Sequence, residues 1–158
     1  MAKYVGETMP AQCVEALDGS NLERKFGRGY VIMTVDADGA PRPGMLSPGE
    51  MLALDDRTVR VALWTGTRTA GNLRRGSPIV ICYVAPNAVF YLKGRASVVL
   101  TPSDDLRVER FEIAIEAVES DAHEGFPVID GIRFTCEEEL RSQWLMQWQD
   151  VLNVLRKP

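Results

Sequence analysis

Several segments of the chain alternate hydrophobic and polar residues with a period of two, which is typical of half-buried β-strands. The clearest is segment 58–64, in which Val59, Val61 and Leu63 share one face. Further β-rich segments lie at 30–35, 41–46, 51–54, 78–84 and 89–100, and turn residues such as Asp38-Gly39 separate them. Six short strands at this spacing predict a closed or partly closed antiparallel barrel, so the expected class is mainly β (α+β).

Segment 41–46 differs from the other strands because it carries prolines at positions 41 and 43, with a third at 48. Proline has no N–H to donate to a neighbouring strand, so this segment is expected to form an edge or a bulged strand. Its backbone then faces either solvent or a flat ligand.

Two longer helices are predicted outside the C-terminal region, in addition to a short helix-compatible run at 68–75. The first covers 8–17, with Thr8 as its cap and Asp18-Gly19 as its end. The second begins at 101–104, where proline occupies the first helical position, and runs to about Ser120. Its apolar face would contain Val108, Phe111, Ile115 and Val118.

A last amphipathic helix is predicted from Glu137 to about Leu155, after a loop at 121–130 and a strand at 131–136. Its apolar stripe consists of Leu140, Trp144, Trp148, Val151 and Leu155. Two tryptophans on such a stripe favour packing in the core or at a subunit interface over a cofactor site.

Length and composition narrow the function classes. With 158 residues the chain is expected to form a single domain, and its net charge of −4 offers no basic field for nucleic acid. No apolar stretch resembles a signal peptide or a membrane span. Three widely spaced cysteines form neither a disulfide framework nor a metal-ligand pair. A reducing cytoplasm is therefore the expected location, with no membrane partner and no bound metal.

Segment 64–73 joins a strand to a short helix-compatible run and carries Gly66, Arg68 and three threonines, of which two or three could donate a hydroxyl. Free N–H groups at a helix start, hydroxyls and a guanidinium together could hold a phosphate. The alternative is a capped turn without a ligand, with Thr65 or Thr67 as the cap.

No catalytic side chain is evident, and the catalytic residues are unknown at this stage. His123, the single histidine, lies in a polar loop and is expected to be exposed to solvent. Cys82 lies in an apolar run and is expected to be a buried, inert thiol. Cys136 has no basic neighbour in the sequence that would make it a nucleophile.

A strand is followed by segment 36–43 (DADGAPRP), by a further strand and by segment 64–80 (WTGTRTAGNLRRGSPIV). In this order of its segments the chain resembles the pyridoxamine 5′-phosphate oxidase-like, FMN-binding split-barrel family. The resemblance covers about residues 29–99. It implies a six-stranded antiparallel split barrel with flanking helices, which forms a homodimer and binds FMN in a groove between subunits.

The resemblance also implies ten cofactor-binding residues. Gly44, Met45, Leu46 and Ser47 would lie along the isoalloxazine ring. Trp64 and Thr65 would contact the cofactor from the end of the following strand. The residues at the phosphate and its helix would be Thr67, Arg68, Thr69 and Asn72. Thr69 stands where the family usually has a lysine. The C-terminus lacks the arginine-leucine signature of true pyridoxamine phosphate oxidases, so that activity is not expected.

The expected function is an FMN-dependent oxidoreductase that moves hydride or electrons between FMN and a small substrate or a nicotinamide donor. A deazaflavin is the nearest alternative cofactor. The alternatives in other classes are a non-catalytic module that binds FMN, haem or another planar ligand, and a structural domain that binds none.

Overall fold

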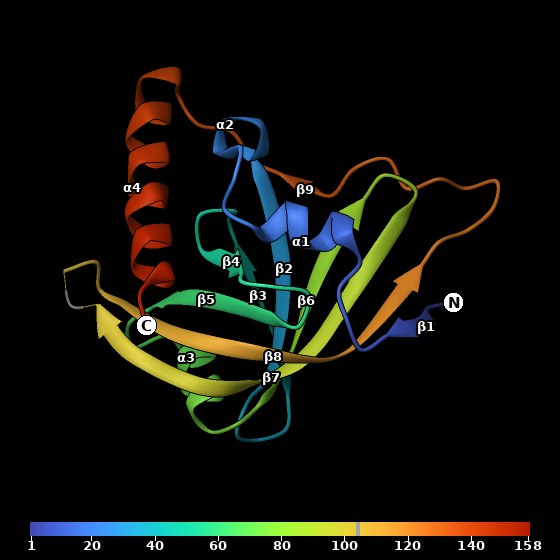
Figure 1. Ribbon diagram of the computed structural model, residues 1–158, viewed down its shortest axis with the longest axis horizontal. Helices are drawn as coiled ribbons and strands as arrows, with labels where there is room; N and C mark the ends of the chain where they lie inside the picture. The colour runs from blue at the N-terminus through green and yellow to red at the C-terminus, as the bar shows by residue number, and fades with distance from the viewer. Residues whose placement is uncertain (104) are drawn as a thin grey trace.

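The computed structural model describes residues 1–103 and 105–158 (Figure 1). In chain order its elements are β1 (Lys3–Gly6), α1 (Ala11–Leu17), α2 (Leu22–Lys25), β2 (Arg28–Val35), β3 (Pro41–Leu46), β4 (Met51–Ala53), β5 (Thr58–Trp64), α3 (Arg68–Arg74), β6 (Pro78–Ala85), β7 (Ala88–Ser103), β8 (Val108–Asp121), β9 (Ile132–Arg133) and α4 (Glu138–Arg156).

The strands form one curled antiparallel sheet in the order β3-β2-β6-β7-β8-β5-β4. Two short strands extend it, β1 alongside β8 and β9 alongside β2. The long strands β7 and β8 curve across the whole molecule (Figure 1). The β-class and the split-barrel shape are confirmed, but the described residues hold nine strands where six were predicted.

The helix predicted from 101 to about Ser120 is wrong, because residues 108–121 form strand β8. Phe111, Ile113 and Ile115 are buried on one face at a spacing of two. Their β-branched neighbours and their pairing with β5 and β7 override the helix-like spacing of the apolar residues. Asp104, within the segment 101–104 where this helix was expected to begin, lies outside the described residues.

Strand β3 lies at one end of the sheet and pairs only with β2, from Tyr30↔Leu46 to Val35↔Pro41. The prediction that the proline-bearing segment forms an edge strand is therefore confirmed. The edge of β3 away from β2 has no strand partner within the described sheet. Its free backbone lies next to the candidate site described below.

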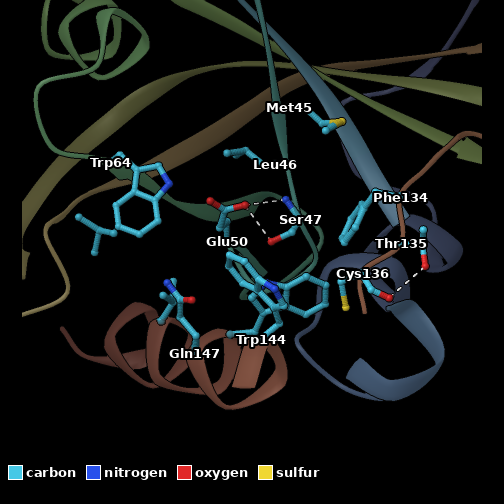
Figure 2. A pocket seen from close by; sticks show the side chains of 13 residues that line it. Met45, Leu46, Ser47, Glu50, Trp64, Phe134, Thr135, Cys136, Trp144 and Gln147 are labelled. Carbon is cyan, nitrogen blue, oxygen red and sulfur yellow. Dashed lines mark hydrogen bonds between the residues drawn. The ribbon is translucent and has the colours of Figure 1, made fainter. Parts of the chain in front are cut away.

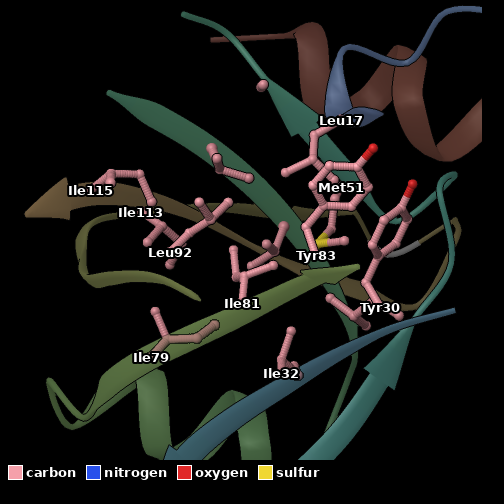
Figure 3. Packing of buried hydrophobic residues seen from close by; sticks show 14 of the residues in the cluster. Leu17, Tyr30, Ile32, Met51, Ile79, Ile81, Tyr83, Leu92, Ile113 and Ile115 are labelled. Atoms are coloured by element: carbon pink, nitrogen blue, oxygen red, sulfur yellow. The ribbon is translucent and has the colours of Figure 1, made fainter. Parts of the chain in front are cut away.

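The main core lies inside the curled sheet and is built from alternating strand residues (Figure 3). Val59, Val61 and Leu63 all belong to it, as the sequence pattern predicts. Figure 3 shows Ile81, Leu92 and Ile113 from three adjacent strands packed together. Burying such side chains contributes roughly 1.5–3 kcal/mol each.

A smaller cluster lies on the outer face of the sheet, where α4 covers it. Leu52, Ala62 and Val108 pack there against Val151, Leu152 and Leu155 of the helix. Arg60 and Arg110 donate hydrogen bonds to carbonyls at the end of α4, including Arg60 Nη1 to Leu155 O at 2.8 Å and Arg110 Nη1 to Val154 O at 2.8 Å. These bonds satisfy carbonyls that a helix end leaves unpaired.

The apolar stripe of α4 is only partly buried. Trp148, Val151 and Leu155 are buried, whereas Leu140 and Trp144 are 41% and 43% exposed. The C-terminal half of the stripe thus packs in the core, as one of the two expected alternatives has it, while the N-terminal half extends beyond the sheet. No helix among residues 1–103 and 105–158 is both long enough and apolar enough to cross a bilayer.

Other boundaries differ in detail from the sequence expectation. Helix α1 begins at Ala11, after Pro10, so Thr8 does not cap it. The predicted strand 131–136 is reduced to Ile132–Arg133. Cys82 is half-buried, because Ile81 and Tyr83 take the core-facing positions of β6. Its pKa is raised by desolvation, which is consistent with an inert thiol.

Candidate functional site

A cavity of about 410 Å³ lies between the ends of β3 and β5 and helix α4 (Figure 2). Its walls come from the end of β3, the turn that follows, the last residue of β5, the first of β8, the segment before α4, and α4 itself. The lining residues are Met45, Leu46, Ser47, Glu50, Trp64, Val108, Phe134, Thr135, Cys136, Trp144, Gln147, Trp148 and Val151.

All three tryptophans of the chain line this cavity. Trp148 is buried and lies against Phe26 and Phe134, with ring centroids 5.2 and 6.2 Å away. Trp64 and Trp144 are about half exposed, at 49% and 43%, so they form the open side of the cavity. The cavity therefore has one fixed aromatic wall and two accessible ones.

Ser47 and Glu50 close a tight turn at the floor of the cavity. Oε2 of Glu50 accepts hydrogen bonds from the backbone N–H of Ser47 at 2.7 Å and from its hydroxyl at 2.8 Å. Burial raises the pKa of the Glu50 carboxyl, and the two bonds from Ser47 offset only part of that shift. Figure 2 shows the carboxyl facing the space between Trp64 and Ser47.

The predicted anion-binding corner forms at the start of α3, with Thr67 as the helix cap. Its Oγ1 accepts a hydrogen bond from the N–H of Ala70 at 3.2 Å. The N–H groups of Arg68 and Thr69 have no acceptor among the described residues, as expected for the first turn of a helix. The Arg68 side chain is exposed and makes no hydrogen bond or ion pair within the described part of the chain.

A buried carboxylate limits the positive character of this corner. Glu109 is 5% exposed, and its Oε1 accepts a hydrogen bond from the N–H of Gly66 at 3.2 Å. Its Oε2 pairs with Arg74. Arg75 is also engaged, because it donates to Asn72. Among Arg68, Arg74 and the C-cap residue Arg75, Arg68 is thus the one open to a ligand.

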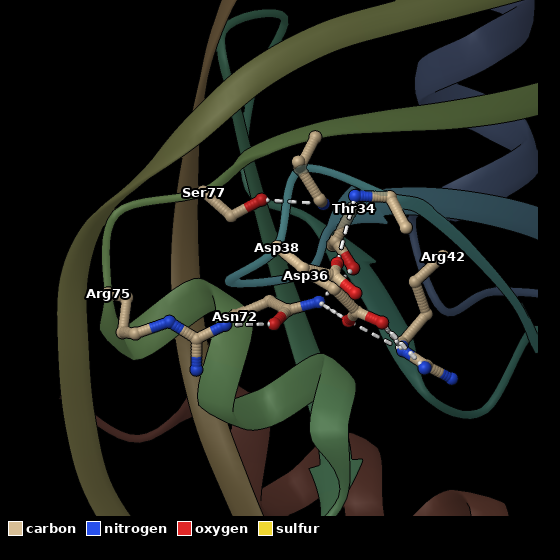
Figure 4. Close-up of polar contacts among 9 residues, drawn as sticks. Thr34, Asp36, Asp38, Arg42, Asn72, Arg75 and Ser77 are labelled. Carbon is tan, nitrogen blue, oxygen red and sulfur yellow. Dashed lines mark hydrogen bonds and ion pairs between the residues drawn. The ribbon is translucent and has the colours of Figure 1, made fainter.

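Asn72 is buried and belongs to a partly buried polar network beside α3 (Figure 4). Its amide donates to Thr34 Oγ1 at 3.0 Å and to Asp36 Oδ1 at 2.8 Å. Asp36 also forms a two-pronged ion pair with Arg42, with Arg42 Nη2 to Asp36 Oδ2 at 2.6 Å. The network joins α3 to β2 and β3, so Asn72 helps to hold the corner in place.

Asp36 makes the contribution of this network to protein stability depend on pH. Hydrogen bonds from Arg42 and Asn72 lower the pKa of Asp36 to about 2, from an ordinary value of about 3.9. A lowered folded-state pKa stabilises the fold above about pH 4, and this contribution is lost as pH falls toward 2. Asp36→Asn should therefore destabilise the protein at neutral pH, and the difference from wild type should shrink between about pH 4 and 2.

Urea unfolding at several pH values measures this difference. Asp150→Asn, on an exposed position of α4, is the control and should change little at any pH. A gap between Asp36→Asn and wild type that stays constant down to pH 2 would contradict the prediction.

The structure brings the predicted site residues into two adjoining groups. Met45, Leu46, Ser47 and Trp64 line the cavity. Thr65, Thr67, Arg68 and Thr69 form the corner at the start of α3. The two groups meet at Gly44, because a Cβ placed there would lie 3.9 Å from Thr69 Oγ1.

Sequence reasoning missed the wall that α4 and its preceding segment contribute. The sequence pattern favours the core or an interface for Trp144 and Trp148, and Trp148 is indeed buried, but both also line the cavity, and no sequence pattern points to Glu50. Cys136 lines the cavity although its sequence neighbours gave no reason to select it. His123 is exposed, as predicted.

Comparisons with known proteins place the fold. No model of a known protein family matches the chain. A protein of Lactobacillus delbrueckii that is pyridoxamine 5′-phosphate oxidase-like is similar over 73% of this chain and 98% of its own, with 20% identity and a TM-score of 0.55. HupZ of group A Streptococcus is similar over 80% of this chain and 100% of its own, with 19% identity and a TM-score of 0.52.

In sequence, the chain is 32% identical to the uncharacterized protein YclD of Bacillus subtilis over 147 residues. This match covers 90% of the chain and 95% of YclD. The chain therefore belongs to the same family as YclD and has the split-barrel fold of pyridoxamine 5′-phosphate oxidase-like proteins.

Proposed function

We propose that the protein binds FMN and is an oxidoreductase acting on a small substrate or a nicotinamide donor. One observation carries the proposal. Within the described residues, an exposed arginine that makes no hydrogen bond or ion pair and two N–H groups without an acceptor adjoin an unpaired strand edge and an aromatic cavity. This combination offers an anion site and a flat apolar surface next to each other, as a phosphorylated planar ligand requires.

The residues of the corner fit a phosphate. The guanidinium of Arg68 and the N–H groups of Arg68 and Thr69 can donate to it. The hydroxyl of Thr69 can donate as well, and that of Thr67 keeps its own hydrogen for donation while it accepts from Ala70. Thr65 is exposed at the same turn and supplies a further hydroxyl.

The ring of the flavin would lie along Gly44–Ser47, where the free edge of β3 offers backbone donors and acceptors. Bound FMN would supply hydride or electron transfer, and the protein would orient the ring and control access of water and substrate. By resemblance to the family, we propose a homodimer with the cofactor at the subunit interface. Trp64 would then border the ring from the end of β5.

Two features weaken the electrostatic attraction for phosphate. Thr69 brings no charge, and Glu109 places a buried carboxylate next to the N–H of Gly66. Phosphate binding therefore depends on Arg68 more strongly than it would in a corner with two cations.

The test is the visible absorption spectrum of protein purified without added cofactor, followed by titration with FMN. Flavin absorbance at about one equivalent per chain supports the proposal. Protein that is colourless and does not respond to FMN at high micromolar concentration overturns it. Titration with a deazaflavin and with haem then identifies another planar ligand.

Arg68→Ala should raise the Kd for FMN by roughly 10- to 100-fold, because a hydrogen bond to a charged group contributes about 1.5–3 kcal/mol. Flavin fluorescence during titration measures the change. Arg24→Ala is the matched control, since it removes an exposed arginine on α2 without altering the corner. Equal FMN affinities of the Arg68→Ala and Arg24→Ala variants would show that Arg68 does not contribute to FMN binding.

Anaerobic mixing of the flavin-loaded protein with NADH or NADPH separates the enzyme from a binding module. Bleaching of the flavin absorbance supports an oxidoreductase that uses a nicotinamide donor. Flavin that is bound but not reduced by either donor favours the non-catalytic alternative.

A further inference from the structure

We propose that the cavity between β3, β5 and α4 binds a small organic cation, such as an aryl- or alkylammonium ion. The cavity adjoins the proposed flavin site and shares Met45, Leu46, Ser47 and Trp64 with it, but the observations that point to a cation do not require bound flavin. Two properties of the cavity point to a cation, namely its aromatic walls and its single carboxylate.

The aromatic walls come from all three tryptophans of the chain and from Phe134. The face of an indole ring attracts a cation more strongly than the face of any other side chain, and ammonium ligands are commonly held in such aromatic enclosures. Trp64 and Trp144 approach from different elements, at the end of β5 and on α4 (Figure 2). A ligand between them would contact two ring systems at once.

The charge of the cavity has one sign. Glu50 is the one carboxylate among the lining residues, and no lysine, arginine or histidine is found among them in the described chain. Both hydrogen bonds from Ser47 go to Oε2 of Glu50, and within residues 1–103 and 105–158 Oε1 accepts none. Oε1 is not among the buried polar atoms that lack a partner, so it is open to solvent and to a cation that enters the cavity. An anionic ligand would instead add a second negative charge.

The accessibility of the cavity agrees with a small ligand. A volume of about 410 Å³ lies within the usual range of small-molecule sites, about 300–1,000 Å³. The half-exposed Trp64 and Trp144 leave the cavity open to solvent, while Trp148 is buried in its wall.

The protonation state of Glu50 provides an independent readout. Burial raises the pKa of its carboxyl, and a bound cation favours the ionised form, so affinity should increase as pH rises through that pKa. Cys136 is the other titratable side chain in the lining, and it carries no positive charge in either state.

The experiment compares three ligands with the same ring and different charge on flavin-free protein: benzyltrimethylammonium, benzyl alcohol and benzoate. Tryptophan fluorescence is a direct reporter because every tryptophan lines the cavity, and calorimetry gives the Kd. Binding of benzyltrimethylammonium at least 10-fold tighter than benzyl alcohol, with benzoate weakest, supports the proposal. Equal affinities, or a preference for benzoate, overturn it.

Glu50→Gln keeps an oxygen that can accept from Ser47 but removes the charge. It should weaken benzyltrimethylammonium about 10-fold or more and leave benzyl alcohol unchanged. Glu139→Gln, an exposed position of α4 outside the cavity lining, controls for the change in net charge and should have no effect. An unchanged affinity in Glu50→Gln would overturn the role of the carboxylate.

Trp64→Leu provides a second variant that leaves the core intact, since this side chain is half exposed. It should weaken the cation several-fold more than the neutral alcohol, because leucine retains apolar contact but has no π-face. Equal losses for both ligands would contradict a cation–π contribution. Because these titrations use protein without flavin, their outcome is separate from that of the FMN titration.

Discussion

Gly94→Ala is expected to lower the free energy of unfolding by about 3 kcal/mol, or to prevent folding, because its strand has no space for a Cβ atom. A Cβ at this position would overlap the carbonyl oxygen of Ala114 and would lie 3.0 Å from the carbonyl carbon. Both atoms belong to the backbone of β8, so no side chain can rotate away. The register between β7 and β8 also shifts between Lys93 and Gly94, so this glycine shapes the irregularity in the longest strand pair.

Urea unfolding followed by circular dichroism measures the effect. Gly71→Ala is the matched control, since a Cβ there would meet only the flexible ends of Arg74 and Arg75, at 3.8 and 3.5 Å. Alanine is also favoured over glycine within a helix, so this variant should be neutral or stabilised by up to about 1 kcal/mol. A Gly94→Ala variant as stable as Gly71→Ala would show that β7 and β8 separate without cost.

Local patterns in the sequence predicted most of the barrel. Val59, Val61 and Leu63 alternate over a stretch bounded by polar residues, and this short-range signal alone places β5 correctly. The prolines of β3 predicted its position at an edge for an equally local reason. The helix prediction for segment 108–121 was wrong because the apolar residues there fit both the helical period and the strand period over part of the segment. Only pairing with β5 and β7, which are distant in the sequence, decides in favour of a strand.

The candidate site likewise has a part that local sequence predicts and a part that depends on tertiary packing. The corner at the start of α3 is continuous in sequence, so Thr67 as its cap and Arg68 as its exposed cation could be predicted. Glu109 enters the corner from β8, and the tryptophans of α4 reach the cavity from the far end of the chain. Such contacts depend on tertiary packing, and no spacing in the sequence encodes them.

The packing of α4 on the barrel leads to the second large effect, that of Gly49→Ala. A Cβ on Gly49 would overlap Cβ and Cγ of Trp148 and would lie 2.6 Å from its Cδ1. Atoms so close to the helix backbone cannot move aside by rotation of the side chain, so α4 would have to shift. We expect a loss of about 2–3 kcal/mol in the free energy of unfolding, together with altered tryptophan fluorescence from the cavity.

A double-mutant cycle with Trp148→Gly tests this cause, because glycine removes both overlapping atoms of residue 148. In that background Gly49→Ala should cost less than about 1 kcal/mol, which gives a coupling energy of roughly 2 kcal/mol between the two positions. Denaturant unfolding of the four proteins supplies the values. Equal costs in both backgrounds would mean that α4 does not press on the 47–50 turn. If the coupling is found, the position of α4, and with it the cavity wall that carries Trp144, is set by the absence of a side chain at residue 49.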